Sequence, residues 1–168
     1  MEFYEVIKSR RSVRAYTDKA IPGDVLDRIG EAVRLAPSAC NIQPWSFRIV
    51  LNGELRRKIA SCYSREWLRQ APAIVLALGN SEECWKRLDG KPIIDMDIGI
   101  VMEHLVLAAA AEGLGTCWIC AYDVERMNKV MNIVSPWSIL AVSPLGYPAE
   151  TPAPIKRKEI SGLFQVLP

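Results

Sequence analysis

Histidine is almost missing from this chain of 168 residues, which holds a single one, His104. Zinc sites are built from several Cys and His ligands, and a Ser-His-Asp triad needs a histidine beside its nucleophile. His104 stands alone in an apolar stretch, so we expect it to be a core or interface residue. The sequence therefore indicates neither a zinc site nor a serine hydrolase.

Excess charge and long hydrophobic runs are also scarce. The 21 Lys and Arg residues against 19 Asp and Glu residues give a formal net charge of +2, too low to indicate a nucleic-acid-binding surface. The most apolar segment, 93–114, is interrupted by Asp95, Asp97 and Glu103, and carboxylates are costly inside a bilayer. No basic region followed by an apolar run opens the chain, as a secretory signal would. We therefore expect a cytoplasmic protein without nucleic-acid or membrane partners.

Neither a repeat nor a low-complexity linker divides the chain, and half of its residues are hydrophobic. This length and composition fit a single globular domain over residues 1–168. The chain also lacks a GxGxxG fingerprint, a P-loop and paired carboxylates at a catalytic spacing. Hydrophobic periodicity predicts both helices and strands. We expect helices at 2–8, 22–36, 54–64, 93–112 and 124–131, the last capped by Asp123, and strands at 46–51, 73–79, 116–119 and 139–145.

Five cysteines make an odd number, which favours free thiols over a disulfide framework. Cys117 and Cys120 nevertheless have the CxxC spacing of redox proteins. A thioredoxin-like pair would open a helix, whereas these two residues fall in and beside the predicted strand 116–119, in which neighbours three apart face opposite sides. A thiol redox protein using Cys117 and Cys120 remains the less favoured alternative.

Three arginines and a hydroxyl follow the first predicted helix, in the run Ser-Arg-Arg-Ser-Val-Arg-Ala-Tyr at 9–16. The planar guanidinium matches a phosphate with two parallel hydrogen bonds. Arg10, Arg11, Ser12 and Arg14 are therefore a candidate site for a phosphorylated ligand. A solvated basic face at a helix end would have the same composition.

The proline-bounded loop 37–45 is a second candidate, because Ser38, Asn41 and Gln43 offer donors and acceptors beside Trp45. Ordinary turn chemistry uses the same residue types. Gly113 and Gly115 could admit a flat ligand close to the backbone, although Gly113 also fits a helix C-cap. Near the C-terminus, the basic run 156–158 could close on the same phosphate or only solubilise the tail, whose apolar end at 163–167 needs to be buried.

Taken in order, these segments resemble the flavin-dependent nitroreductase family. The resemblance rests on 9–16, on Ala-Pro-Ser-Ala-Cys-Asn-Ile-Gln-Pro-Trp at 36–45, and on Glu-Gly-Leu-Gly-Thr-Cys-Trp-Ile at 112–119 paired with Leu-Gly-Tyr-Pro at 145–148. It implies an α+β fold with a mostly antiparallel sheet surrounded by helices. It also implies an intertwined homodimer, with C-terminal strand exchange and one FMN in each of two interface clefts.

The family's binding residues can be carried over position by position. Arg10 would lie nearest the FMN phosphate together with Lys156 and Lys158, and Arg14 would lie toward the N1/O2 edge of the flavin ring. The partner subunit would contribute the loop, and Trp118 and Ile119 at the end of the third motif would pack on the ring. The implied cofactor-binding set is Arg10, Arg11, Ser12, Arg14, Pro37, Ser38, Ala39, Asn41, Gln43, Trp118, Ile119, Lys156 and Lys158.

The resemblance implies an oxidoreductase that passes electrons from NAD(P)H through FMN to an electron-poor acceptor such as a nitroaromatic or a quinone. The flavin would carry the chemistry, so no catalytic side chain is expected. Two features depart from the family: Cys120-Ala121 replaces the common Glu-Gly pair, and the segment 79–93, which usually covers the flavin, is compact. A flavin-binding protein with little turnover is the main alternative.

Overall fold

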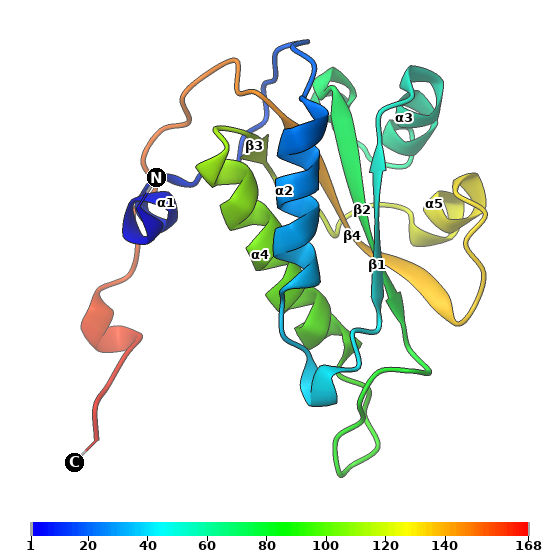
Figure 1. The fold of residues 1–168 in the computed structure, drawn as a ribbon, viewed down its shortest axis with the longest axis vertical. Coiled ribbons are helices and arrows are strands. Elements are labelled where there is room, and N and C mark those ends of the chain that lie inside the picture. Colours follow the sequence, from blue (N-terminus) through cyan, green and yellow to red (C-terminus); the bar gives the residue numbers. More distant parts are fainter. Residues whose placement is uncertain (1, 168) are drawn as a thin grey trace.

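A four-stranded antiparallel sheet forms the middle layer of the computed structural model, which describes residues 2–167. Its strand order is β1-β2-β4-β3, with β1 at Trp45–Val50, β2 at Ala73–Asn80, β3 at Gly115–Thr116 and β4 at Trp137–Gly146. Helices α2 (Gly23–Arg34) and α4 (Ile94–Ala111) cover one face, and α3 (Gly53–Ala60) and α5 (Val124–Val130) lie on the other (Figure 1). The α+β architecture with an antiparallel sheet is therefore confirmed.

Strand β2 is the central element because its whole run, AIVLALGN, is buried. A continuous apolar run of this length predicts a strand covered on both faces. Its side chains alternate between the two layers: Ile74, Leu76 and Leu78 join the core under α3 and α5. Ala73 and Val75 join the core under α2 and α4. The sheet thus fixes the positions of α2, α3, α4 and α5.

Helix α4 runs for 18 residues along the sheet and carries buried side chains on several faces. The helix is apolar on most of its faces because both the sheet and α2 pack against it. It ends in the turn predicted for Gly113, whose φ of +75° is the left-handed cap conformation. The Leu114 N–H then donates to the Ala109 carbonyl at 2.8 Å, which is the Schellman pattern.

Helices α3 and α5 begin at side-chain caps. Asn52 Oδ1 accepts from the Leu55 N–H at 2.9 Å and Asp123 Oδ1 from the Arg126 N–H at 3.0 Å. Such caps satisfy helix donors that would otherwise have no partner. The predicted Asp123 cap is confirmed.

The predicted strand at 116–119 is wrong in extent, since β3 ends at Thr116. The Cys117 N–H donates to the Ser143 hydroxyl at 3.1 Å instead of to a strand carbonyl, and the ladder resumes only as a single bridge between Ile119 and Val142. The predicted helix at 54–64 is also too long, because α3 ends at Ala60 and its next residues form a tighter turn. The predicted C-terminal strand exchange stays a prediction.

The two ends of the chain lie away from the layers, where helix α1 (Phe3–Ser9) and the segment after β4 project from the same side of the body (Figure 1). That segment first pairs with residues 15–17 through a bridge between Tyr16 and Pro148, and farther along, within the described residues, it forms a short turn, η3, at Ile160–Gly162. Its apolar side chains Leu163, Phe164, Val166 and Leu167 are all exposed. No described helix is long and apolar enough to cross a bilayer.

Candidate functional site

Residues 10–16, here called the arginine segment, follow α1 and run in extended form beside β3. Ser12 forms a parallel bridge with Thr116, and the Val13 N–H donates to the Thr116 carbonyl at 2.9 Å. The close approach requires Gly115, because a Cβ there would lie 2.7 Å from the Val13 Cβ. Val13 therefore fills the space beside Gly115, and this glycine leaves no space there for a flat ligand.

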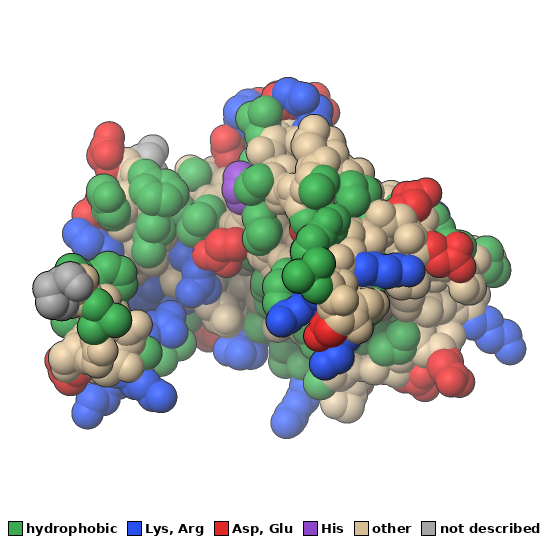
Figure 2. Space-filling model, turned by 90° about the horizontal axis from the view of Figure 1, so that it is seen from below, with side chains coloured by type: hydrophobic (Ala, Val, Ile, Leu, Met, Phe, Trp, Pro, Cys, Tyr) green, Lys and Arg blue, Asp and Glu red, His purple; other side chains and the backbone are tan. Residues whose placement is uncertain are grey.

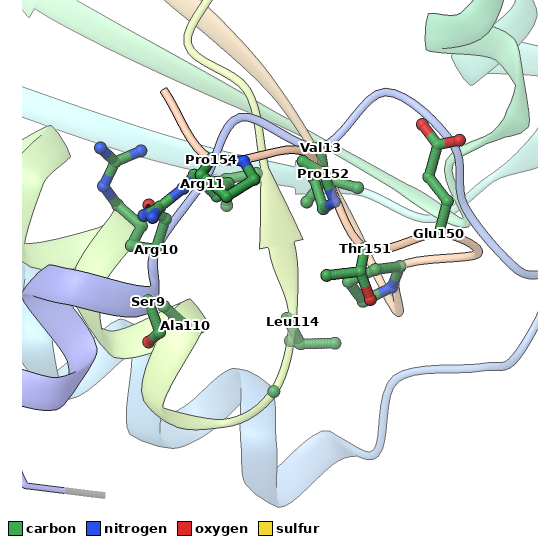
Figure 3. Close-up of a pocket in the computed structure, with 13 residues that line it drawn as sticks. Ser9, Arg10, Arg11, Val13, Ala110, Leu114, Glu150, Thr151, Pro152 and Pro154 are labelled. Carbon is green, nitrogen blue, oxygen red and sulfur yellow. Dashed lines mark hydrogen bonds between the residues drawn. The ribbon is translucent and has the colours of Figure 1, made fainter. Parts of the chain in front are cut away.

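A cavity of about 400 Å³ opens where this segment, the end of α4 and the C-terminal segment meet. In Figure 3, Arg10 and Arg11 lie toward one end of it and Glu150 toward the other, with Pro152 and Pro154 between. A neighbouring cavity of about 410 Å³ brings Lys8 and Arg157 beside the same two arginines, with Glu103 as its carboxylate. Figure 2 shows Lys and Arg side chains gathered in the hollow between the body and the projecting C-terminal segment.

We call these two adjoining cavities together the basic cavity. Its two shared arginines, Arg10 and Arg11, differ in the contacts that their side chains make. Arg11 folds back on the end of α1, where its Nη1 donates to the carbonyls of Lys8 (2.6 Å) and Arg10 (2.8 Å). Cations at a helix C-terminus stabilise it through its last carbonyls. Arg11 therefore acts in part as the helix-end residue that the alternative interpretation describes. Arg10 caps α1 with its backbone N–H, whereas its side chain makes no hydrogen bond to the described residues and lines both cavities.

Ser12 and Arg14 both act on the thiol of Cys117. Burial raises the pKa of the Cys117 thiol, while the Arg14 charge and a hydrogen bond with Ser12 act in the opposite direction. The Arg14 guanidinium carbon also lies 5.9 Å from the centre of the Trp67 ring, within cation–π range. The exposed Arg14 side chain thus sets a positive charge close to the segment that starts at Cys117.

The segment after β3 presents one aromatic side chain and buries its neighbour. Trp118 is 40% exposed, and its Nε1 donates to the exposed Cys120 Sγ at 3.1 Å. Ile119 is buried in the core, and its N–H and carbonyl both bond to Val142. Trp118 is therefore the side chain that this segment offers to a ligand.

The loop after α2 adopts a strained turn, η1, at Ala39–Asn41. Cys40, Asn41 and Gln43 have φ values of 51°, 55° and 54°, in the left-handed region. The Gln43 N–H donates to Ser38 Oγ at 2.8 Å, and Gln43 Nε2 donates to Asn41 Oδ1 at 3.0 Å. Asn41 and Gln43 are exposed and held in one arrangement, as residues at a binding site often are.

One chain does not bring this loop to the arginines. The loop lies at the first turn of α4, where the Ala39 N–H donates to Asp97 Oδ1 at 3.2 Å. The basic cavity lies at the last turn, against Ala110. A rise of 1.5 Å per residue places Asp97 and Ala110 ~20 Å apart along the helix. Figure 1 shows the same separation, with the loop at one end of the α2/α4 layer and residues 10–16 at the other.

The C-terminal basic run lies on the projecting segment, and its predicted contact with the FMN phosphate stays a prediction. Lys156 and Lys158 are exposed on the projecting segment, and Arg157 between them lines the cavity beside Arg10. Lys8 and Glu103 also line it. Sequence reasoning missed Lys8 and Glu103, and it included Arg157 only as part of the basic run 156–158. The spacing of Lys8 two residues before Arg10 was the available signal for one of them.

This arrangement agrees with the comparison to known proteins. The sequence model of the nitroreductase family matches residues 7–62 and 59–147. The chain belongs to the nitroreductase family. The resemblance inferred from the three motifs is thereby confirmed.

Relatives cover most of the chain. A Methanothermobacter thermautotrophicus protein with the name NADH dehydrogenase/NAD(P)H nitroreductase is 34% identical over 161 residues, which is 90% of this chain and 80% of that protein. The Bacillus subtilis FMN reductase [NAD(P)H] is 30% identical, over 89% of this chain and 68% of its own. The crystal structure of a nitroreductase family protein from Clostridium novyi superposes with a TM-score of 0.84 at 35% identity, covering 89% of this chain and 87% of the other.

Proposed function

We propose that this nitroreductase family member is an NAD(P)H-dependent FMN oxidoreductase. The observation that carries the proposal is the pair of adjoining cavities that share Arg10 and Arg11, one beside β3 and the other lined by Arg157, in a chain whose relatives include a protein named FMN reductase [NAD(P)H]. Bound FMN would supply hydride and electron-transfer chemistry that no side chain of the described site offers.

The residues present fit the parts of FMN. The guanidinium of Arg10 suits the phosphate, because it lines an open cavity without a helix-end role. The half-exposed Trp118 suits the flat apolar ring. Arg14, near Cys117, would favour negative charge on the ring edge. The Asn41 and Gln43 amides suit ring or ribityl oxygens and nitrogens.

A complete site requires two copies of the chain in this proposal. The loop with Asn41 and Gln43 lies at the far end of α4 from Arg10, so one chain would hold the phosphate while a second chain supplies the loop. The exposed apolar tail at 163–167 supports the same assembly, because apolar side chains of this kind are stable only when another surface covers them. We therefore propose a homodimer, with the tail crossing to the partner's sheet.

The acceptor in this proposal is a small electron-poor molecule such as a nitroaromatic or a quinone. NAD(P)H would bind, deliver its electrons and leave before the acceptor takes the same place. Initial rates measured with both substrates varied test this exchange. Parallel lines in double-reciprocal plots support it, and intersecting lines contradict it. Gel filtration of the flavin-loaded protein tests the dimer.

A further inference from the structure

Asp97 is buried in the first turn of α4, with 1% of its surface exposed. Among the buried polar side chains of residues 2–167, it alone is a carboxylate. Its backbone is fixed by the helix, since the Asp97 N–H donates to the Ile93 carbonyl. The carboxylate therefore has a defined position on a rigid element.

This carboxylate has one partner, which belongs to the loop after α2. Asp97 Oδ1 accepts from the Ala39 N–H at 3.2 Å, across 58 positions of sequence. Oδ2 is equally buried and has no partner among the described residues. Burying a carboxylate with one hydrogen bond is unfavourable, and an apolar residue at this place in the core would suit stability better. The presence of a carboxylate at Asp97 therefore points to a role outside stability.

The loop that Asp97 contacts needs an external anchor. Cys40, Asn41 and Gln43 all have left-handed φ values, which are unfavourable for residues with a Cβ. Ser38 makes no capping bond to the turn that follows it, because its hydroxyl accepts from Gln43 instead. The hydrogen bond from Ala39 to Asp97 thus ties the start of the turn to α4.

We propose that Asp97 is a positioning residue for cofactor binding. Its carboxylate holds the backbone of Ala39, which sets the turn that presents Asn41 and Gln43 to the flavin site of the partner subunit. This inference rests on the proposed function, since it assigns a task to a loop that the function places at FMN. Asp97 itself touches neither cofactor nor substrate.

The test measures FMN affinity by fluorescence titration of flavin-free protein, with the melting temperature of each flavin-free variant alongside. Asp97→Ala removes the acceptor, and Ala39→Pro removes the donor; Ser38 is already extended, as a residue before proline requires. We expect each to raise the FMN Kd about tenfold to a hundredfold, the range for a lost hydrogen bond to a charged group. Asp97→Asn keeps an oxygen acceptor without the charge and should weaken FMN binding less than Asp97→Ala does.

The double variant and a matched control make the test specific. If both changes break one hydrogen bond, Asp97→Ala with Ala39→Pro weakens FMN binding no more than the stronger single change does. Asp95→Ala, an exposed carboxylate in the same helical turn, leaves the Kd unchanged. Should Asp97→Ala fail to fold, Ala39→Pro and Asp97→Asn still decide the matter.

Three results would overturn the inference: a normal Kd in Ala39→Pro or in a folded Asp97→Ala, additive effects in the double variant, or an Asp97→Asn variant as weak as Asp97→Ala. A change in melting temperature without a change in Kd would likewise show a merely structural role. A parent protein that binds no FMN would overturn the proposed function itself, which is a distinct outcome.

Discussion

Arg28 on α2 donates two parallel hydrogen bonds to Glu112 at the end of α4, from Nε to Oε1 at 2.7 Å and from Nη2 to Oε2 at 2.8 Å. Asp24, one turn earlier on α2, accepts from the same guanidinium at 2.9 Å. A carboxylate at a helix C-terminus is destabilised by the negative end of the helix dipole. The positive charge of Arg28 offsets this effect on the Glu112 carboxylate. The pair joins the two helices that lie between the loop and the basic cavity.

The pair predicts a stability difference that depends on pH. The hydrogen bond from Arg28 holds the pKa of Glu112 below its ordinary value, so the contribution is present above that ordinary value and is lost as pH falls through the lower folded value. Glu112→Gln should lower the melting temperature slightly at pH 7, less at high salt because the pair is exposed, and not at all at pH 2. Thermal melts at both pH values check this. An equal loss at pH 2 and pH 7 would contradict it.

The contact of Gly115 with Val13 predicts a destabilising variant with a matched rescue. Gly115→Ala places a Cβ where Val13 lies, which should cost about 1–3 kcal/mol of unfolding free energy through overpacking and shift the arginine segment. Val13→Gly in the same chain removes the Cβ and both methyl groups that obstruct it. Urea unfolding of Gly115→Ala, Val13→Gly and the double variant measures this. The double variant should lose less stability than the sum of the two single losses, and additive losses would contradict the contact.

Arg10→Ala should raise the FMN Kd about tenfold to a hundredfold, because a charge-assisted contact to phosphate is lost. Arg34→Ala is the control, since Arg34 is exposed on α2 and paired with Glu31. Flavin fluorescence titration measures both. Unchanged FMN binding in Arg10→Ala would remove the basic cavity from the cofactor site.

The two-copy site predicts complementation between defective chains. A mixed dimer of Arg10→Ala and Asn41→Ala subunits contains one site with both defects and one site with neither. We expect such a dimer, purified with two different tags, to hold about one FMN per dimer with parent-like affinity. Were both residues from one chain to serve the same site, no normal site would form and no high-affinity flavin would be found.

Much of this account follows from the sequence. The all-buried strand β2, the apolar helix α4 and the cap at Asp123 each depend on local patterns that reach across few residues. The extent of β3 does not follow from the sequence, because the Cys117 N–H donates to the Ser143 hydroxyl, 26 residues away. The carboxylate at Asp97 was noticed only as an interruption of an apolar run, since its partner Ala39 is set by tertiary packing. Arg157 was predicted only as part of the basic run 156–158, because its place beside Arg10 is also set by tertiary packing.

Cysteine chemistry should prove dispensable. Cys117 is buried and burial raises its pKa, so its thiol stays protonated at neutral pH and is a poor nucleophile. Iodoacetamide at pH 7 should label Cys40 and Cys120 ahead of Cys117, as read by peptide mass spectrometry. Cys120→Ser should keep the rate of NAD(P)H oxidation. Loss of activity in Cys120→Ser would favour the thiol redox alternative.

The most direct measurement of the central claim is an absorption spectrum of the purified, FMN-reconstituted protein before and after anaerobic addition of NADH and, separately, NADPH. The account predicts flavin bands that bleach with at least one of the two donors. Protein that takes up no FMN, or flavin bands that persist with both donors, would contradict it.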